Sequence, residues 1–241
     1  MEKTTEKTIG QIVANDYRSA AVFKKFGIDY CCNGNRGINE ACKQKNIDLT
    51  ELRYELEMVL AKPTTETTDY KSWPLDLLAD YIEKKHHRYV EQQIPVLKEY
   101  LNKINNVHGA KHRELQQIQD LFCESIGELA SHMKKEELIL FPYIRKMVKV
   151  KKGVEILSEP RFGTVKNPIH SMMSDHDNEG ERFRKIETLS NNYTPPKNAC
   201  NTYNVTYALL KEFQDDLHTH VHLENNILFP KSVELEKELI T

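Results

Sequence analysis

Residues 132–142 read HMKKEELILFP, and residues 220–230 read HVHLENNILFP. Both stretches fit the pattern His-x3-Glu-x2-Ile-Leu-Phe-Pro, so the motif occurs twice at an offset of 88 residues. A single His–Glu pair four residues apart is usually a solvent-exposed contact on one helix. Two copies with the same apolar tail instead indicate an internal repeat with a shared chemical role.

The His and Glu of each copy continue the apolar face of a predicted helix rather than its charged face. An imidazole and an unpaired carboxylate pointing into a helical core would cost several kcal/mol. A metal ion would remove that cost by supplying the missing positive charge. For one helix alone, a buried His–Glu hydrogen bond would be the simpler interpretation.

Apolar residues at three- and four-residue steps predict four long helices, at about 74–107, 111–149, 170–189 and 202–238. Most of the connections between them are short, which favours antiparallel packing. We therefore expect an all-α protein whose C-terminal part, residues 73–241, is an antiparallel four-helix bundle.

A smaller helical domain is predicted for residues 1–61, followed by a Thr-rich linker at 62–72. Within this domain Asp16 is the expected N-cap of a helix that stops at Gly27. Asp48 or Thr50 is the expected N-cap of a last helix that runs to Leu60.

Four histidines, one in each predicted long helix, lie at matched distances from the turns: His86, His132, His176 and His220. The first two are each 23 residues from Gly109, and the last two are each 22 residues from Asn198. Equal distances from the turn of an antiparallel hairpin place residues at equal heights. The sequence therefore predicts four imidazoles at one level, with Glu136 and Glu224 one helical turn further along.

Four imidazoles and two carboxylates around one point suit a site for two metal ions. If both glutamates bridge, each metal receives two nitrogen and two oxygen donors. Six-coordinate iron would then keep about two positions for an oxo or hydroxo bridge and for O2, NO or peroxide. Nitrogen and oxygen donors without thiolate favour iron or manganese over closed tetrahedral zinc.

The neighbouring polar residues are assigned weaker roles. His87 lies about 100° around the helix from His86 and is expected to flank the site or face solvent. His218 and His222 are expected to face away from His220, at the surface. Asp175 either orients a ligand or relays protons, or it is an ordinary exposed helical residue.

The sequence Asp-Tyr-Cys-Cys-Asn-Gly at residues 29–34 is the second unusual feature. The adjacent Cys31 and Cys32 cannot form a relaxed disulfide. Redox exchange, nitrosation, transient metal holding and a plain pair of reduced thiols all remain open for them. Cys42, Cys123 and Cys200 are interpreted as ordinary thiols.

The composition excludes several classes of protein. With 34 Lys and Arg against 36 Asp and Glu, the formal net charge is −2, which gives no electrostatic case for a nucleic-acid binder. No apolar run approaches the roughly 18 residues of a membrane span, and residues 1–11 lack a signal-peptide core. We expect a cytoplasmic protein with reduced thiols and no membrane partner.

Together these motifs resemble the iron–sulfur cluster repair di-iron proteins, also called repair-of-iron-centres proteins. The Asp-Tyr-Cys-Cys-x-Gly signature of their N-terminal domain is matched by residues 29–34. The two metal-binding stretches of their haemerythrin-like domain are matched by residues 131–142 and 220–230. The resemblance covers nearly the whole chain.

The resemblance implies two non-haem irons and the repair of Fe–S proteins damaged by nitric oxide or oxidants, through NO binding or reduction or through iron delivery. It also implies a cytoplasmic bacterial protein and a homodimer. Carried over residue by residue, it assigns the iron ligands to His86, His132, Glu136, His176, His220 and Glu224. The cysteine pair maps to Cys31 and Cys32, and Asp175 stands where known forms carry Glu.

Two other classes of function remain open on the sequence alone. One is a haemerythrin-like sensor or carrier of O2 or NO without turnover, although a dedicated carrier would need more histidines to saturate its irons. The other is a metal-free helical adaptor, for which the common height of the histidines would be a coincidence.

Overall fold

The chain is helical throughout, as its periodicity predicts. The computed structural model describes residues 7–62 and 68–240, and within these ranges the only β-type pairing is a single bridge between Thr8 and Gly37. The N-terminal domain contains four short helices, α1 (Ile9–Asn15), α2 (Ser19–Lys25), α3 (Ile38–Lys45) and α4 (Leu49–Leu60). The predicted all-α class is confirmed.

Side-chain caps mark the starts of α1 and α4, whereas α2 and α3 begin without one; Asp16, predicted as the N-cap of α2, is the C-cap residue of α1. Thr8 and Gln11 form a reciprocal capping box at the start of α1. Asp48 accepts hydrogen bonds from the first turn of α4, as predicted for that N-cap. Gly27 follows α2 with a φ of 63°, a left-handed conformation that glycine adopts without strain.

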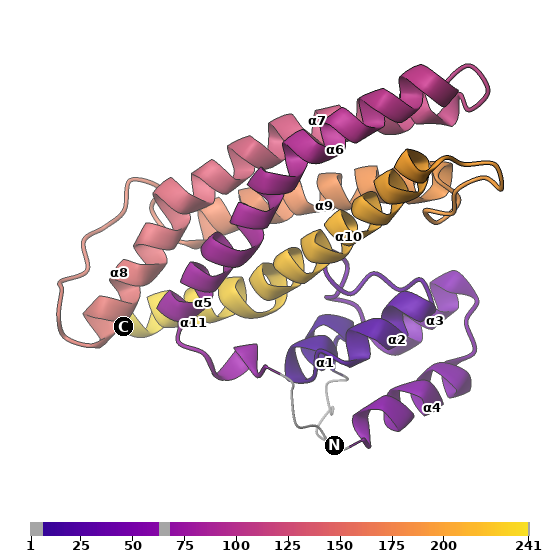
Figure 1. Ribbon diagram of the computed structural model, residues 1–241. Coiled ribbons are helices and arrows are strands. Elements are labelled where there is room, and N and C mark those ends of the chain that lie inside the picture. The colour runs from indigo at the N-terminus through magenta and orange to yellow at the C-terminus, as the bar shows by residue number, and fades with distance from the viewer. Residues whose placement is uncertain (1–6, 63–67, 241) are drawn as a thin grey trace.

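The C-terminal part forms four long helical rods, three of which are interrupted by a π-turn. They are α5 (Leu75–Tyr81), η2 (Ile82–His87) and α6 (Arg88–His108); α7 (Glu114–Lys135), η3 (Glu136–Leu140) and α8 (Phe141–Lys151); α9 (Lys166–Leu189); and α10 (Asn201–Leu223), η4 (Glu224–Leu228) and α11 (Phe229–Ile240). Figure 1 shows the rods lying side by side, with α6 against α7 and α10, and α7 against α9. This is the predicted antiparallel four-helix bundle.

The two π-turns η3 and η4 begin at the glutamates of the repeated motif. In each, the N–H of the phenylalanine donates to the carbonyl of the glutamate five residues earlier, from Phe141 to Glu136 and from Phe229 to Glu224. Each phenylalanine precedes a proline, which has no N–H to give to the helix. A π-turn adds one residue to a helical turn, and such turns are frequent at functional sites.

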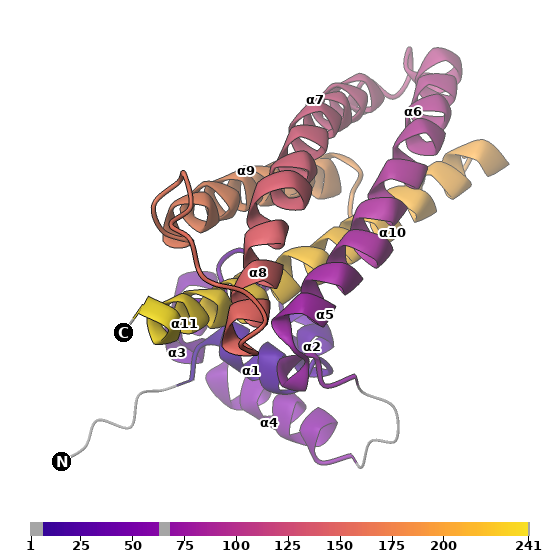
Figure 2. The same ribbon diagram turned by 90° about the vertical axis from the view of Figure 1, so that its left-hand side faces the viewer.

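The bundle has a second apolar cluster at one end, beyond the motif. Figure 2 shows α5, α8 and α11 gathered there, in agreement with their mutual contacts. Buried Leu78, Ile144 and Phe229 belong to this cluster. The histidines and glutamates of the motif thus lie between two apolar layers, away from either end of the bundle.

The N-terminal domain packs along α10 and against the turn η4 (Figure 1). Its buried side chains are continuous with those of the bundle. The Tyr17 hydroxyl lies 2.7 Å from the Thr219 hydroxyl, and Arg184 Nη1 donates to Asp29 Oδ2 at 2.7 Å. This docking places the cysteine loop directly against the bundle, an arrangement that the sequence alone did not predict.

The predicted division into 1–61, 62–72 and 73–241 stays a prediction. Residues 63–67 of the linker and residues 1–6 lie outside the described residues. Of the remaining linker, residues 70–72 form the 3-10 helix η1 (Tyr70–Ser72), and the ring of Tyr70 packs against Trp73 and Tyr81.

Candidate metal centre

Two groups of four donor side chains meet in the middle of the bundle. In each group the donor atoms lie within 4.8 Å of one another: His132, Glu136, His176 and Glu224 form the first group, and His87, Glu136, His220 and Glu224 form the second. All six side chains are buried. Because both glutamates belong to both groups, the arrangement offers two candidate cation positions that share two carboxylates.

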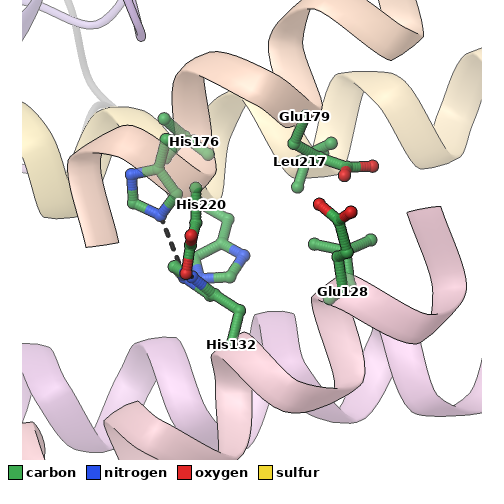
Figure 3. A pocket seen from close by; sticks show the side chains of 9 residues that line it. Glu128, His132, His176, Glu179, Leu217 and His220 are labelled. Atoms are coloured by element: carbon green, nitrogen blue, oxygen red, sulfur yellow. Dashed lines mark hydrogen bonds and ion pairs between the residues drawn. The ribbon is translucent and has the colours of Figure 1, made fainter. Parts of the chain in front are cut away.

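The spacing within the first group is that of ligands around one cation. The Nε2 atoms of His132 and His176 lie 3.0 Å apart (Figure 3). Two donors at about 2.1 Å from a metal, at a right angle to each other, would be separated by about 3.0 Å. The Nε2 atom of His132 lies 3.3 Å from Glu136 Oε2, and that of His176 lies 3.2 Å from Glu224 Oε2.

The second group contacts the other oxygen of Glu224 and the same oxygen of Glu136. His220 Nε2 lies 3.1 Å from Glu224 Oε1, and His87 Nε2 lies 3.4 Å from Glu136 Oε2. The rings of His87 and His220 have their centroids 4.9 Å apart.

Several buried polar atoms at this site form no hydrogen bond within the described structure. They include Nε2 of His87, both carboxylate oxygens of Glu136, and Oε2 of Glu224; Nδ1 of His220 and Nε2 of the neighbouring His86 are also unpaired. Buried polar groups are almost always hydrogen-bonded, so this many unpaired atoms among the donor groups need another partner. A pair of cations would satisfy them, and the donor set of imidazole nitrogen and carboxylate oxygen suits iron or manganese.

The electrostatics favour the same interpretation. Burial raises the pKa of Glu224, but His220 and His176 outweigh burial and hold it well below its usual range. Burial lowers the pKa of His132, but the charge of Glu136 and the hydrogen bond to Asp175 outweigh it and raise this pKa to about 10. The carboxylates therefore stay anionic, and protons compete with cations for the nitrogen donors.

The residue that follows each glutamate orients a histidine from a neighbouring helix. Glu137 Oε1 lies 3.1 Å from Nδ1 of His87, and Asn225 Oδ1 lies 2.9 Å from Nδ1 of His176. With Nδ1–H donating outward, Nε2 keeps its lone pair for the inside of the site. Such outer partners fix the tautomer and the ring orientation of metal-binding histidines.

Asp175 contacts the ring of His132 rather than that of its sequence neighbour. Its Oδ2 atom lies 3.3 Å from His132 Nδ1 and accepts from Lys135 Nζ at 3.2 Å. The His132 hydrogen bond and the Lys135 contacts lower the pKa of Asp175 to about 2. The geometry matches the first of the two roles that the sequence suggested, the orientation of a ligand.

The structure brings together five of the six predicted ligands and leaves His86 out. Nδ1 of His86 lies 3.0 Å from Asp216 Oδ1, and His87 occupies the place in the second group that the sequence had assigned to His86. The cause is the π-turn η2, which adds one residue to the helical turn. After Ile82, the residue that faces the bundle interior therefore comes one position later than in a regular α-helix.

The sequence carried no direct signal for His87. Regular α-helical spacing leads to His86 both forward from Ile82 and backward from Leu97, which lies 11 residues, about three turns, away. Only the π-turn of the structure places His87 at the inner face.

His222 was predicted to face the surface, and this prediction is wrong. Its side chain is buried, its Nδ1 atom lies 3.0 Å from Asn226 Nδ2, and its ring lies between Tyr17 and Tyr30. It does face away from the metal centre, as predicted, but the N-terminal domain covers that face. His218 also contacts the ring of Tyr30.

A small cavity opens beside the first cation position. It measures about 10 Å³, room for roughly one water molecule, and its walls include His132, His176 and His220. In Figure 3 the carboxylates of Glu128 and Glu179 face each other across it, opposite the histidines. A ligand of about the size of one water molecule therefore has space next to the site.

The cysteine loop is fixed to the helix turn that carries Glu224. Nδ2 of Asn225 donates to the Cys31 carbonyl at 3.2 Å, and Nδ2 of Asn226 donates to the Tyr30 carbonyl at 3.2 Å. The Cys32 thiol donates to the carbonyl of His176 at 3.5 Å. Cys31 and Cys32 are both free thiols, Cys31 buried and Cys32 partly exposed.

A four-helix bundle that buries four histidines around two shared glutamates is a metal-binding protein of the haemerythrin type. In agreement, residues 79–232 match the family described as Hemerythrin HHE cation binding domain, and residues 5–60 match the family described as Domain of Unknown function (DUF542).

Similarity to curated proteins extends over 95% of the chain. The chain is 33% identical to the "Iron-sulfur cluster repair protein YtfE" of Escherichia coli O8 (strain IAI1), and the matched region covers 97% of that protein. It is 32% identical to proteins of the same name from Musicola paradisiaca (strain Ech703) and Citrobacter koseri, covering 96% and 97% of them. The chain therefore belongs to the family of iron–sulfur cluster repair proteins, as its motifs indicated.

The sequence predicts no membrane-spanning segment. Across residues 7–62 and 68–240, none of the helices combines the length and the apolar character that crossing a bilayer requires.

Proposed function

We propose that this chain is a di-iron protein that repairs iron–sulfur clusters damaged by nitrosative or oxidative stress. The observation that carries the proposal is the pair of four-donor groups joined by the buried Glu136 and Glu224. The repair function in the names of the relatives supports it, because the similarity includes both the metal-binding and the cysteine-containing parts of the chain.

In this proposal one iron is held by His132 and His176 and the other by His87 and His220, with Glu136 and Glu224 shared between them. Bound iron supplies open coordination positions for NO or an oxygen species and electrons for their reduction.

The protein itself contributes position and enclosure. Glu137, Asn225 and Asp175 hold three of the histidines by Nδ1, which keeps each Nε2 directed inward. Leu129 and Leu217 line the cavity beside the first position and limit the water that can enter. The small volume of the cavity favours a ligand of about the size of one water molecule over a larger substrate.

The same cavity supports a second candidate, a sensor or carrier that binds NO or O2 without turnover. Consumption of many NO molecules per protein, or recovery of a damaged [4Fe–4S] enzyme, distinguishes the repair function from it. We expect recovery with the iron-loaded full chain and none with chain from which iron has been removed by a chelator.

The proposal extends to location and partners. We place the protein in the cytoplasm, with damaged Fe–S proteins as clients and NO or oxygen species as small ligands. The five free cysteines are consistent with a reducing compartment. We also propose a homodimer, for which light scattering on the full chain is the direct test.

The first experiment is metal analysis of protein purified without oxygen. We expect two irons per chain in the wild type and severe loss of iron in His132→Ala and Glu224→Ala. His170→Ala, which changes an exposed histidine on α9, is the matched control and should keep both irons. Full iron loading in both ligand variants would refute the assignment.

A further inference from the structure

A second cluster of metal-binding side chains lies outside the bundle centre. We propose that Asp29, Cys31 and Cys32 form a third cation site, which takes a thiophilic divalent ion. One oxygen and two sulfur atoms of these side chains lie within 4.8 Å of one another. The identification of the natural ion as ferrous iron rests on the proposed function. The binding of a cation by the two thiols is independent of that function.

The two sulfur atoms have the separation of ligands on a single ion. Sγ of Cys31 lies 3.7 Å from Sγ of Cys32, and neither cysteine is in a disulfide. Thiolates at about 2.3 Å from a tetrahedral ion would be about 3.8 Å apart. Because adjacent cysteines cannot close a relaxed disulfide, the pair stays available as two separate donors.

Asp29 is held with one oxygen toward the thiols. Its Oδ2 atom accepts from Arg184 Nη1 at 2.7 Å and from Asn33 Nδ2 at 2.9 Å. Its Oδ1 atom lies 3.4 Å from Cys31 Sγ. An oxygen and a sulfur ligand on one tetrahedral ion would be separated by about 3.5 Å, so the third donor fits the same ion.

A path to solvent exists on the side of the loop that faces α2. A cavity of about 100 Å³ is lined by Asp29, Cys31, Lys24, Arg184 and others. The two cationic residues in its wall are each paired with a carboxylate outside the proposed site, Lys24 with Asp215 and Arg184 with Glu181. Their charge is therefore already balanced and does not exclude a cation.

The site adjoins the metal centre of the bundle. Cys32 Sγ contacts the backbone carbonyl of His176, whose ring belongs to the first cation position. Gly180 of α9 leaves space for the sulfur, since a Cβ at that position would come within 3.0 Å of it. An ion held by the cysteine pair would thus lie between the bundle centre and the cavity.

Binding follows a simple balance of charge. Each thiol releases its proton to solvent, so one divalent ion displaces two protons and forms two metal–sulfur bonds and one metal–oxygen bond. The fourth position of a tetrahedral ion remains open to water or to a ligand from a recipient protein.

Cobalt(II) titration of the reduced full chain, freed of iron by a chelator and kept under nitrogen, tests the site. Thiolate-bound Co²⁺ has an intense near-ultraviolet charge-transfer band that Co²⁺ bound only by nitrogen and oxygen lacks. We expect three equivalents of Co²⁺ per chain, one of which produces the band. The variant Cys31→Ser/Cys32→Ser should bind two equivalents and lack the band, whereas Cys42→Ser, at a buried cysteine of the same domain, should behave as the wild type.

Absence of the band from the wild type, or its retention in Cys31→Ser/Cys32→Ser, would overturn the proposal. If that variant does not fold by circular dichroism, Cys32→Ser, which changes a partly exposed side chain, should still weaken the band. The two proposals fail separately: two equivalents without the band remove only the thiol site, and one equivalent with the band removes only the bundle centre.

Discussion

The two copies of the His–Glu motif hold the metal-binding residues alike but have opposite surroundings. After Glu136 the first copy continues with Leu138 and Ile139, whose side chains are 73% and 48% exposed. In the second copy Ile227 is only 3% exposed, because the N-terminal domain covers η4. One copy therefore faces outward, and the other forms the interface between the domains.

The difference begins at the residue that follows each glutamate. Glu137 and Asn225 both accept from the Nδ1 of a histidine in another helix. A carboxylate only accepts, whereas an amide also donates, and Asn225 uses its N–H to hold the Cys31 carbonyl. The repeat thus preserves the metal-binding positions and changes the next residue where a second domain has to dock.

The largest expected effect belongs to the glutamates, which the two cation positions share. Glu136→Ala removes a donor from both groups at once, and the variant should lose nearly all bound iron. Glu124→Ala, at an exposed carboxylate of α7, should leave the iron content unchanged. Iron analysis of oxygen-free preparations measures both, and equal iron content in the two variants would contradict the shared role.

The next effect separates two adjacent histidines. Because η2 turns His87 inward and His86 toward Asp216, His87→Ala should lower iron binding at least tenfold, and His86→Ala should keep two irons per chain. Competition with a metal-binding dye gives both affinities. The reverse order would mean that the bundle follows regular α-helical spacing in this rod.

A smaller effect distinguishes the two outer partners. Glu137→Ala and Asn225→Ala should each weaken metal binding by about 10- to 100-fold, since each frees the outer nitrogen of a histidine. Only Asn225→Ala should also speed the reaction of Cys32 with a thiol reagent, because it releases the Cys31 carbonyl.

Asn225→Asp sharpens this test, because it keeps an acceptor for His176 and loses the donor to the loop. It should bind metal more tightly than Asn225→Ala while its thiol reaction stays fast. Equal thiol reactivity in wild type, Glu137→Ala and Asn225→Ala would show that the cysteine loop is not held through Asn225.

The smallest effect concerns the docking of the two domains. A Cβ at Gly10 would overlap the side-chain amide of Asn226, so Gly10→Ala should lower the free energy of unfolding by about 1–3 kcal/mol. Leu138→Ser, at the exposed position of the other copy, should change it by no more than about 0.5 kcal/mol. Urea denaturation measures the difference, and equal stability of the two variants would argue against close packing of α1 on η4.

Periodicity and the repeat were enough to predict the four rods, their antiparallel order and five of the six side chains at the centre. The sixth was misplaced because counting assumes 3.6 residues per turn, and η2 departs from that number just before His87. A π-turn depends on tertiary packing around the site, which leaves only an indirect trace in the sequence.

The burial of His222 was missed for a different reason. The pattern of α10 shows which face turns toward the bundle, but the opposite face is buried by Tyr17 and Tyr30 from a separate part of the chain. Helical periodicity within one segment contains no information about a domain that docks from outside. The contacts of the cysteine loop with Asn225 and Asn226 were unpredictable on the same ground.

The most direct test is a crystal structure of iron-loaded protein with anomalous scattering measured at the iron edge. The account predicts two peaks between Glu136 and Glu224, one next to His132 and His176 and the other next to His87 and His220. A single peak, or peaks away from these glutamates, would contradict it.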